Sequence, residues 1–342
     1  MATTTVLVTG ASGFVGLALA EHLLARGDRV VGYDLAAPPP AARRAFAALP
    51  GRFDAVAGDV RDPAALGRAL RDHAVERIVL LAAITADAAR ERAMPQAILE
   101  VNVGGVLAAL DAAAGAGVGR VVLGSSGSVY GAAGYATTPL DERDTPLRPE
   151  GLYGISKQAA EAAAARLAAL HGIDLRTGRL GTCFGPWEAA TGVRDTLSAP
   201  WQVLHHARHG RAVRLPRDSR RDWLYVRDAA AALAALLDAP SPPAPVYHLA
   251  AGFEWSLSQW CERVAAWHPG FAWRIAGDAG DADDADGDAG ANGAARIDCY
   301  APRDRAPMSI RRLRADTGFA PRFDLPEAAA DFHAWLQATD RD

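Results

Sequence analysis

Apolar residues recur along the first half of the chain in two alternating patterns. Short β-branched runs, typical of buried strands, occur in TTTVLVTG, DRVVGYDL, RFDAVAGD, ERIVLLAA, GRVVLGSS and IDLRTGRL. Between several of them lie Ala- and Leu-rich stretches with helical spacing, which predict helices over 14–26, 96–114 and 153–170. Apolar strands that alternate with helices indicate a parallel sheet covered on both faces. We therefore expect an α/β fold with a doubly wound, Rossmann-type parallel sheet.

The pattern changes after about Gly181. Longer irregular stretches with more Trp and Pro follow, such as GPWEAATGVRDTLSAPWQ, and they indicate a smaller second lobe. A helix over 228–237 and the strand VYHLA are expected to return to the main sheet. The predicted organisation is thus a Rossmann domain over 1–180, rejoined by 222–250, and an interleaved substrate lobe that makes up most of 181–342.

One segment, GDAGDADDADGDAGANGAA at 277–295, has low complexity and is expected to be a disordered surface loop. Its Asp and Gly content suggests a calcium loop as the alternative. Placing Gly287 sixth puts Ala282 first and Gly293 twelfth, where an EF-hand needs Asp and Glu. The alternative is therefore disfavoured.

Composition narrows the class of ligand. Half of the 342 residues are hydrophobic and the formal net charge is −4, and the basic residues form no stripe interleaved with aromatic ones. These features disfavour nucleic acid and favour a small molecule. No signal peptide or membrane span is expected, because the apolar runs are short and interrupted by charges. We expect a soluble, cytoplasmic protein.

Cysteine and histidine usage gives no metal site. Cys183, Cys261 and Cys299 are odd in number and far apart, which disfavours both a disulfide framework and a zinc site. The group His205, His206 and His209 has a spacing like that of metal ligands, but neither a carboxylate nor a Cys joins it. A solvated helix face is the favoured interpretation.

A Gly-rich turn follows the first strand in VTGASGFVG. Gly10, Gly13 and Gly16 would let the backbone approach a pyrophosphate at the start of the next helix. Asp34 ends the second strand eighteen residues after Gly16, near the spacing of a carboxylate that binds adenosine ribose hydroxyls. Such a carboxylate repels a 2′-phosphate and favours NAD. The alternative, NADP bound by Arg43 and Arg44, is weaker because both lie well past the strand end.

Tyr153 and Lys157 stand four apart in LYGISKQAAEA, so on a helix both can point into one cleft. A nearby ammonium stabilises a phenolate and is expected to lower the tyrosine pKa by about one to three units. Upstream, GRVVLGSS ends a predicted strand with Ser125 and Ser126. Ligands of doubly wound folds bind at the carboxyl ends of the strands. A hydroxyl there could hold a substrate oxygen.

These motifs together resemble one family. VTGASGFVG, GYDL, GDVRD, LLAAIT, VNVGG, SSGSVYG, YGISK, GPW and RRDWLYVRD occur in the order seen in extended short-chain dehydrogenase/reductases, in the NAD-dependent epimerase/dehydratase branch that includes UDP-galactose 4-epimerase. The resemblance is dense to about Gly185 and thinner afterwards. It implies an NAD-dependent enzyme that binds the cofactor through Gly10, Gly13, Phe14, Gly16, Asp34, Asp59, Val60, Leu81, Ala82, Ala83, Asn102, Tyr153 and Lys157.

The resemblance also implies a mechanism. Tyr153 would be the acid/base, Lys157 its electrostatic partner and ligand of the nicotinamide ribose, and Ser126 the group that positions the reacting oxygen. A proton would leave a secondary alcohol as a hydride moves to NAD⁺. The substrate would be held by Thr85, Ser126, Ser128, Thr182, Arg194 and Arg221. A homodimer that pairs the helices over 96–114 and 153–170 is also implied.

Departures from the family pattern bear on the substrate. Dehydratases carry Asp-Glu where this chain has Gly127 and Ser128, so sugar dehydration is disfavoured. Thr182 replaces a usual Asn and Ala301 a usual Arg, which weakens the interpretation as a diphosphate-sugar enzyme. We therefore expect an oxidoreductase acting on a sugar or sugar-derived anion. The alternatives are a UDP-hexose 4-epimerase and a non-catalytic dinucleotide sensor, which typically loses the Tyr or the Lys.

Overall fold

The computed structural model describes residues 3–192, 194–240, 243–277, 294–299, 301 and 303–339. Of the low-complexity segment expected at 277–295, residues 278–293 lie outside these ranges. The disorder and the calcium loop considered for that segment therefore fall on residues that the structure does not describe.

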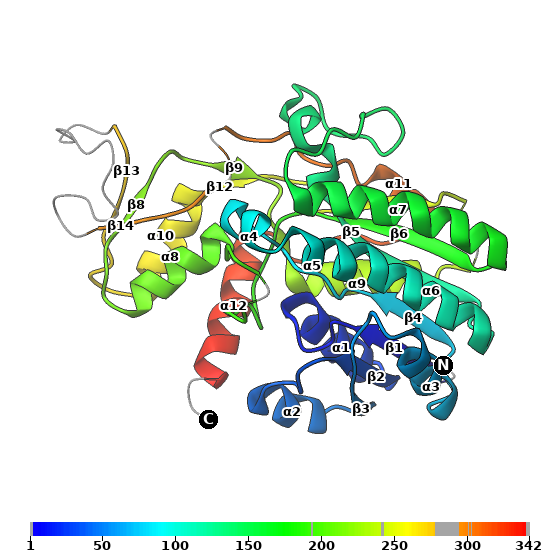
Figure 1. The fold of residues 1–342 in the computed structure, drawn as a ribbon. Helices are drawn as coiled ribbons and strands as arrows, with labels where there is room; N and C mark the ends of the chain where they lie inside the picture. The colour runs from blue at the N-terminus through cyan, green and yellow to red at the C-terminus, as the bar shows by residue number, and fades with distance from the viewer. Residues whose placement is uncertain are drawn as a thin grey trace.

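A seven-stranded parallel sheet forms the centre of the molecule (Figure 1). Its spatial order is β11-β6-β5-β4-β1-β2-β3. The strands are β1 (Thr5–Thr9), β2 (Arg29–Asp34), β3 (Arg52–Ala57), β4 (Arg77–Leu80), β5 (Arg120–Ser126), β6 (Asp174–Leu180) and β11 (Val246–Leu249). The strand order reverses between β1 and β4, where doubly wound folds place their ligands.

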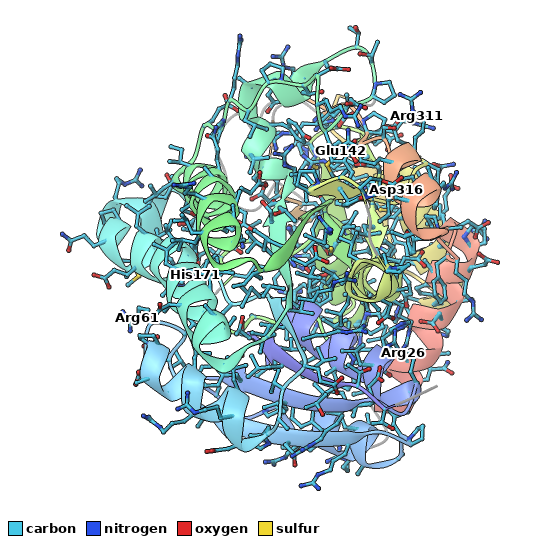
Figure 2. All side chains as sticks on the ribbon, turned by 90° about the vertical axis from the view of Figure 1, so that its right-hand side faces the viewer. Arg26, Arg61, Glu142, His171, Arg311 and Asp316 are labelled. Atoms are coloured by element: carbon cyan, nitrogen blue, oxygen red, sulfur yellow. The ribbon has the colours of Figure 1, made fainter. Side chains whose placement is uncertain are left out.

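Helices cover both faces of this sheet. On one face lie α3 (Pro63–Asp72), α6 (Gly105–Ala116) and α7 (Leu152–His171), and on the other α1 (Phe14–Ala25), α2 (Pro40–Ala47) and α9 (Val226–Asp238). Figure 2 shows Arg61 and His171 on the first side and Arg26 and Asp316 on the second. This confirms the predicted doubly wound α/β class.

Strand β1 explains why the sheet needs two layers of helices. Val6, Leu7 and Val8 have no exposed surface. Val6 and Val8 pack with α1 and α9, whereas Leu7 packs with α3, α6 and α7. Successive side chains of a strand point to opposite faces, so a strand that is apolar at every position is stable only between two covered faces.

The C-terminal lobe has its own aromatic core, which includes Phe184, Trp223 and Trp260. Its helices are α8 (Ala199–Arg208), α10 (Leu257–Trp267) and α12 (Leu325–Thr339). A sheet of order β13-β8-β14 joins Trp273–Ile275, Val213–Leu215 and Ala295–Arg296. Two short pairs join β7 (Cys183–Phe184) to β10 (Leu224–Tyr225) and β9 (Arg220–Arg221) to β12 (Trp255–Ser256). Helix α11 (Arg311–Thr317) packs near β11.

The helix predicted over 96–114 lies inside one continuous helical stretch, Pro95–Ala116. That stretch consists of α5 (Pro95–Leu99), a π-helical turn (Glu100–Gly104) that the sequence did not predict, and α6, and the short helix α4 (Ala88–Ala93) precedes it. The Asn102 amide in that turn accepts a hydrogen bond from Ile84 N at 2.7 Å and donates to Ser156 Oγ at 3.0 Å. These bonds join the loop after β4 to α7. The wider turn coincides with this buried side chain, which sequence periodicity does not reveal.

Among the described residues, Pro95–Ala116 is the one helical stretch with the length and mean hydropathy, 1.6, of a membrane span. The stretch contains the π-helical turn, and α6 packs against α3 and α7. Core helices of soluble proteins meet the same criterion, so this stretch is weak evidence for a membrane segment.

Candidate active site

A cavity of about 530 Å³ lies at the carboxyl ends of the central strands. The Gly-rich turn, the ends of β4 and β5 and the start of α7 form one wall. The segment around 189–196 and the C-terminal lobe form the other. Its lining includes Gly10, Gly13, Phe14, Gly16, Leu81, Ala83, Thr85, Ser126, Ser128, Tyr153, Lys157, Thr182, Arg194 and Arg221. Residues far apart in the sequence therefore meet in one space.

The Gly-rich turn is shaped as a cradle. Gly10 has φ +69°, and a Cβ there would lie 2.7 Å from Ala82 N. A Cβ on Gly16 would lie 2.1 Å from the Gly10 carbonyl oxygen. Both positions thus require glycine, and α1 begins at Phe14 immediately afterwards. This cradle at a helix N-terminus fits the pyrophosphate of a dinucleotide.

Asp34 lies beside this turn at the end of β2. Its Oδ2 accepts a hydrogen bond from Ser12 N at 2.9 Å, and its Oδ1 accepts one from Ala36 N at 3.2 Å. The carboxylate therefore ties the Gly-rich turn to the residues that follow β2.

Five predicted cofactor residues, Asp34, Asp59, Val60, Ala82 and Asn102, are not part of the cavity wall. Asp59 forms an ion pair with Arg61 at 2.6 Å, and hydrogen bonds from Arg61 lower the pKa of its carboxyl. The amide N of Ala82 donates to Thr9 Oγ1. Asn102 has no exposed surface, and its amide is engaged with Ile84 and Ser156. Asn102 thus lies outside the cavity lining and binds the loop that follows β4.

Helix α7 brings Tyr153 and Lys157 to the cavity. Lys157 is 4% exposed, and its Nζ donates a hydrogen bond to the Gly124 carbonyl oxygen at 2.8 Å. That Nζ lies 6.0 Å from the centroid of the Tyr153 ring. Burial lowers the pKa of Lys157 to about 8, and the Glu161 charge opposes this shift.

The net pKa shift of Tyr153 in the protein alone is opposite to the lowering expected from a nearby ammonium. Burial raises the pKa of Tyr153. Hydrogen bonding to Ser126 and Thr85 and the charge of Arg194 partly oppose this shift. Desolvation of the phenol outweighs the nearby positive charges. A cationic nicotinamide in the cavity would lower this pKa.

The serines after β5 have separate partners. Ser126 Oγ donates to Ser128 Oγ at 3.1 Å and accepts from Ser128 N, and both residues line the cavity. Ser125 also lines the cavity, but its Oγ donates to Glu161, which is not part of the lining. Ser126 is therefore the serine of the three that reaches both the cavity and Tyr153.

Two of the predicted substrate residues are arginines that line the cavity. Arg194 pairs with buried Glu188 at 3.1 Å, and its Cζ lies 5.5 Å from the Phe14 ring centroid. Arg221 donates to the Cys299 carbonyl oxygen at 2.8 Å and, at 3.4 Å, to Thr182 Oγ1. The Glu188 partner holds Arg194 in place beside the Gly-rich turn.

Three further residues line the cavity that the sequence analysis did not assign to the site, namely Arg305, Asp222 and Cys183. Arg305 lies on the lobe side of the cavity, and its Nε is buried without a hydrogen-bond partner. Asp222 accepts a hydrogen bond from Met308 N at 2.8 Å, and burial raises its pKa to about 7. Burial raises the pKa of the Cys183 thiol to about 12, so this thiol is unreactive. Arg305, four residues after Ala301, supplies a guanidinium near the place where the family pattern has an Arg and this chain has Ala301.

The described residues contain no group of three or more His, Cys, Asp or Glu side chains that could hold a metal ion. His205 stacks on Trp201 at 4.7 Å, and His209 Nδ1 contacts the His205 carbonyl oxygen. Trp187 and Trp223 are buried in the two cores. The histidines thus occupy the surface of α8, outside the cavity.

Comparisons with known proteins agree with this geometry. The chain is 30% identical to a probable UDP-glucuronate 4-epimerase of Rhizobium meliloti, over 68% of each chain. It is 35% identical to UDP-glucuronate 4-epimerase 5 of Arabidopsis thaliana, over 54% of this chain and 42% of that one. The matched part of the chain thus covers 68% and 42% of the lengths of these two relatives.

Solved structures match almost the whole chain. MoeE5 in complex with UDP-glucuronic acid and NAD has a TM-score of 0.75 and 26% identity, covering 98% of this chain and 99% of its own. The epimerase Mth375 of Methanothermobacter thermautotrophicus has a TM-score of 0.80 at 23% identity, with 99% and 94% covered, and supports the fold alone. The model of the NAD dependent epimerase/dehydratase family matches residues 6–250. With a dinucleotide cradle and a Tyr/Lys pair in one cavity, the chain belongs to the NAD-dependent epimerase/dehydratase family.

Proposed function

We propose that the protein is an NAD-dependent epimerase acting at a secondary alcohol of a nucleotide-linked hexose or hexuronic acid. One observation carries this proposal: Ser126, Tyr153 and Lys157 share a cavity with three arginines, Arg194, Arg221 and Arg305. Hydroxyl and phenol groups suit proton transfer at an alcohol, and guanidinium groups suit phosphate or carboxylate. The UDP-glucuronate and UDP-glucose 4-epimerases among the relatives support the same substrate class.

Each residue has a proposed role. Tyr153 exchanges the proton of the reacting hydroxyl, and the hydroxyls of Ser126 and Thr85 hold the phenol and the substrate oxygen in place. Lys157 presents its ammonium, anchored on the Gly124 carbonyl, to the nicotinamide ribose. Bound NAD supplies the hydride acceptor. Ser128 and Thr182 complete the polar wall around the substrate.

The cofactor would lie along the first half of the chain. We propose that Gly10, Gly13, Phe14 and Gly16 contact the pyrophosphate and Asp34 the adenosine ribose. Asp59 and Val60 would flank adenine, Leu81 to Ala83 would run beside the dinucleotide, and Asn102 would act through its bonds to Ile84. Residues 1–180 with 222–250 thus form the NAD-binding domain, and 181–342 mainly the substrate lobe. Three buried, free cysteines support a reducing compartment such as the cytoplasm.

The fate of the hydride separates the proposed epimerase from a dehydrogenase. An epimerase returns the hydride to the substrate, whereas a dehydrogenase releases NADH. The purified protein should be incubated with NAD and a panel of UDP-hexoses, UDP-hexuronic acids, free sugars and sugar acids. Absorbance of NADH and product separation are followed together, with Tyr153→Phe protein as the control.

We expect an epimerised UDP-sugar with no net NADH from the wild-type protein. Stoichiometric NADH release would identify a dehydrogenase instead. Binding of NAD with no turnover of any panel member, and the same result for the Tyr153→Phe control, would favour the sensor.

We propose that the helices over 96–114 and 153–170, which correspond to α5 with α6 and to α7, form a homodimer interface. Exposed apolar side chains occur on or beside both helices, with Leu99 40% and Ile155 43% exposed. Small Ala and Gly residues on the neighbouring helices allow close helix packing. Light scattering of wild-type protein should give twice the monomer mass, and Leu99→Glu should give a monomer. Leu35→Glu, at a residue 74% exposed outside these helices, should remain dimeric. A monomeric wild type would contradict the interface.

A further inference from the structure

A buried polar cluster lies next to Lys157 along α7, and of its members only Ser125 belongs to the cavity lining. Glu161, Arg179 and Ser125 are 8%, 4% and 2% exposed and come from α7, β6 and β5. Arg179 Nη2 donates to Glu161 Oε2 at 2.7 Å, and its Nε donates to Oε1 at 3.0 Å. Ser125 Oγ donates to the same carboxylate. The Glu161 carboxylate thus joins three elements at once.

This cluster is adjacent to the proposed catalytic group in two ways. Glu161 follows Lys157 by four residues on α7, so the two side chains lie on the same face of the helix. Successive residues of β5 also bind that face, because the Gly124 carbonyl accepts from Lys157 and Ser125 donates to Glu161. The next residue, Ser126, is already in the cavity. The strand end and the helix are therefore joined at two consecutive points.

We propose that Glu161 is a positioning residue for Lys157. With Arg179 and Ser125 it holds the end of β5 against α7, and its carboxylate is the counter-charge that keeps the buried ammonium protonated. The inference rests on the role proposed above for Lys157.

The effect of the Glu161 charge on the pKa of Lys157 supports the proposed positioning role. The ammonium of Lys157 has lost most of its hydration, and Glu161 is the charged group that raises its pKa against burial. Arg179 shares the same carboxylate and so weakens its effect on Lys157. The other groups near this face are Tyr153 on α7 and Tyr130, which accepts from Arg179 at 2.8 Å. His248 contacts the Tyr130 hydroxyl. Burial lowers the pKa of His248 to about 4, so its imidazole is neutral.

The protonation state of Lys157 sets the direction in which activity should depend on pH. Lys157 acts in NAD binding and turnover as an ammonium. Its contribution to both is present below its pKa of about 8 and is lost as the pH rises through that value. Removal of the Glu161 charge lowers this pKa further. Loss of activity on the alkaline side then begins at a lower pH.

The test compares Glu161→Gln with Glu142→Gln. Glu142 is a buried carboxylate at the far side of the same polar network, and it accepts a hydrogen bond from His248 N. Turnover and NAD affinity, the latter from quenching of tryptophan fluorescence, are measured between pH 6 and 9.5 alongside thermal melting. In Glu161→Gln we expect the alkaline midpoint of both quantities to move down by about one pH unit. Glu142→Gln should lower the melting temperature without moving the midpoint.

Further variants make each outcome decisive. Glu161→Asp restores the charge and should return the midpoint toward that of the wild type. Arg179→Gln leaves the carboxylate to Lys157 and should move the midpoint upward, which tests the inference if Glu161→Gln does not fold. Unchanged midpoints in the folded variants would overturn it and leave Glu161 a purely structural residue. If instead Lys157→Met keeps the wild-type alkaline limb, the proposed role of Lys157 itself fails.

Discussion

Tyr153→Phe is expected to reduce turnover by about 10³-fold while NAD affinity stays within about twofold of wild type. General acid–base catalysis contributes about 10²–10⁴-fold, and the substitution removes the only atom of Tyr153 that can exchange a proton. The ring remains, so the packing at the start of α7 is kept. Steady-state kinetics on the substrate found in the panel, with a fluorescence titration of NAD, measure the two effects.

Tyr225→Phe is a matched control for this substitution. Its hydroxyl is also buried and donates a hydrogen bond, to Asp331, but it lies in the lobe core away from the cavity. The control should lose stability and retain turnover. Activity within about threefold of wild type in Tyr153→Phe would remove the tyrosine from the mechanism.

Asp34→Asn is expected to weaken NAD binding by about tenfold or more and to strengthen NADP binding. Hydrogen bonds to a charged group contribute about 1.5–3 kcal/mol, and the carboxylate also repels a 2′-phosphate. The amide can still accept from Ser12 N or Ala36 N, so the Gly-rich turn should keep its shape. Titration of both cofactors measures the ratio of their dissociation constants.

Asp62→Asn is the corresponding control. Asp62 also accepts hydrogen bonds from backbone N–H groups, those of Ala64 and Ala65, but it caps α3 outside the cavity. Its substitution should leave the NAD/NADP ratio unchanged. A wild-type protein that already prefers NADP would contradict the assignment of Asp34.

The regular part of the fold was predictable because its determinants are local. Val6, Leu7 and Val8 are apolar at successive positions, which only a strand covered on both faces tolerates. Gly10 and Gly16 are glycine because no side chain fits there. The π-helical turn inside the helix over 96–114 was less predictable. This turn occurs where the Asn102 side chain forms long-range hydrogen bonds with Ile84 and Ser156. The helical periodicity of the sequence does not reveal such bonds.

The candidate site was only partly predictable. Tyr153, Lys157 and Ser126 could be selected from their motifs, and the structure brings them together, although their roles stay predictions. The direction of the Tyr153 pKa shift could not be obtained from spacing, because it depends on burial and on Thr85, Ser126 and Arg194. Arg305 could not be selected from the sequence either, because the fold of the C-terminal lobe brings this residue to the cavity.

By itself, the sequence determined the alternation of strands and helices, the glycine cradle and the presence of a tyrosine, a lysine and a carboxylate at the required spacings. These are properties of neighbouring residues, set by sterics, hydrophobic periodicity and helix geometry. Only the tertiary structure decided how far each group is desolvated, which arginines face the cavity and that Glu161 binds Arg179 next to Lys157. Desolvation and ion pairing depend on elements that lie far apart along the chain, and no local pattern records them.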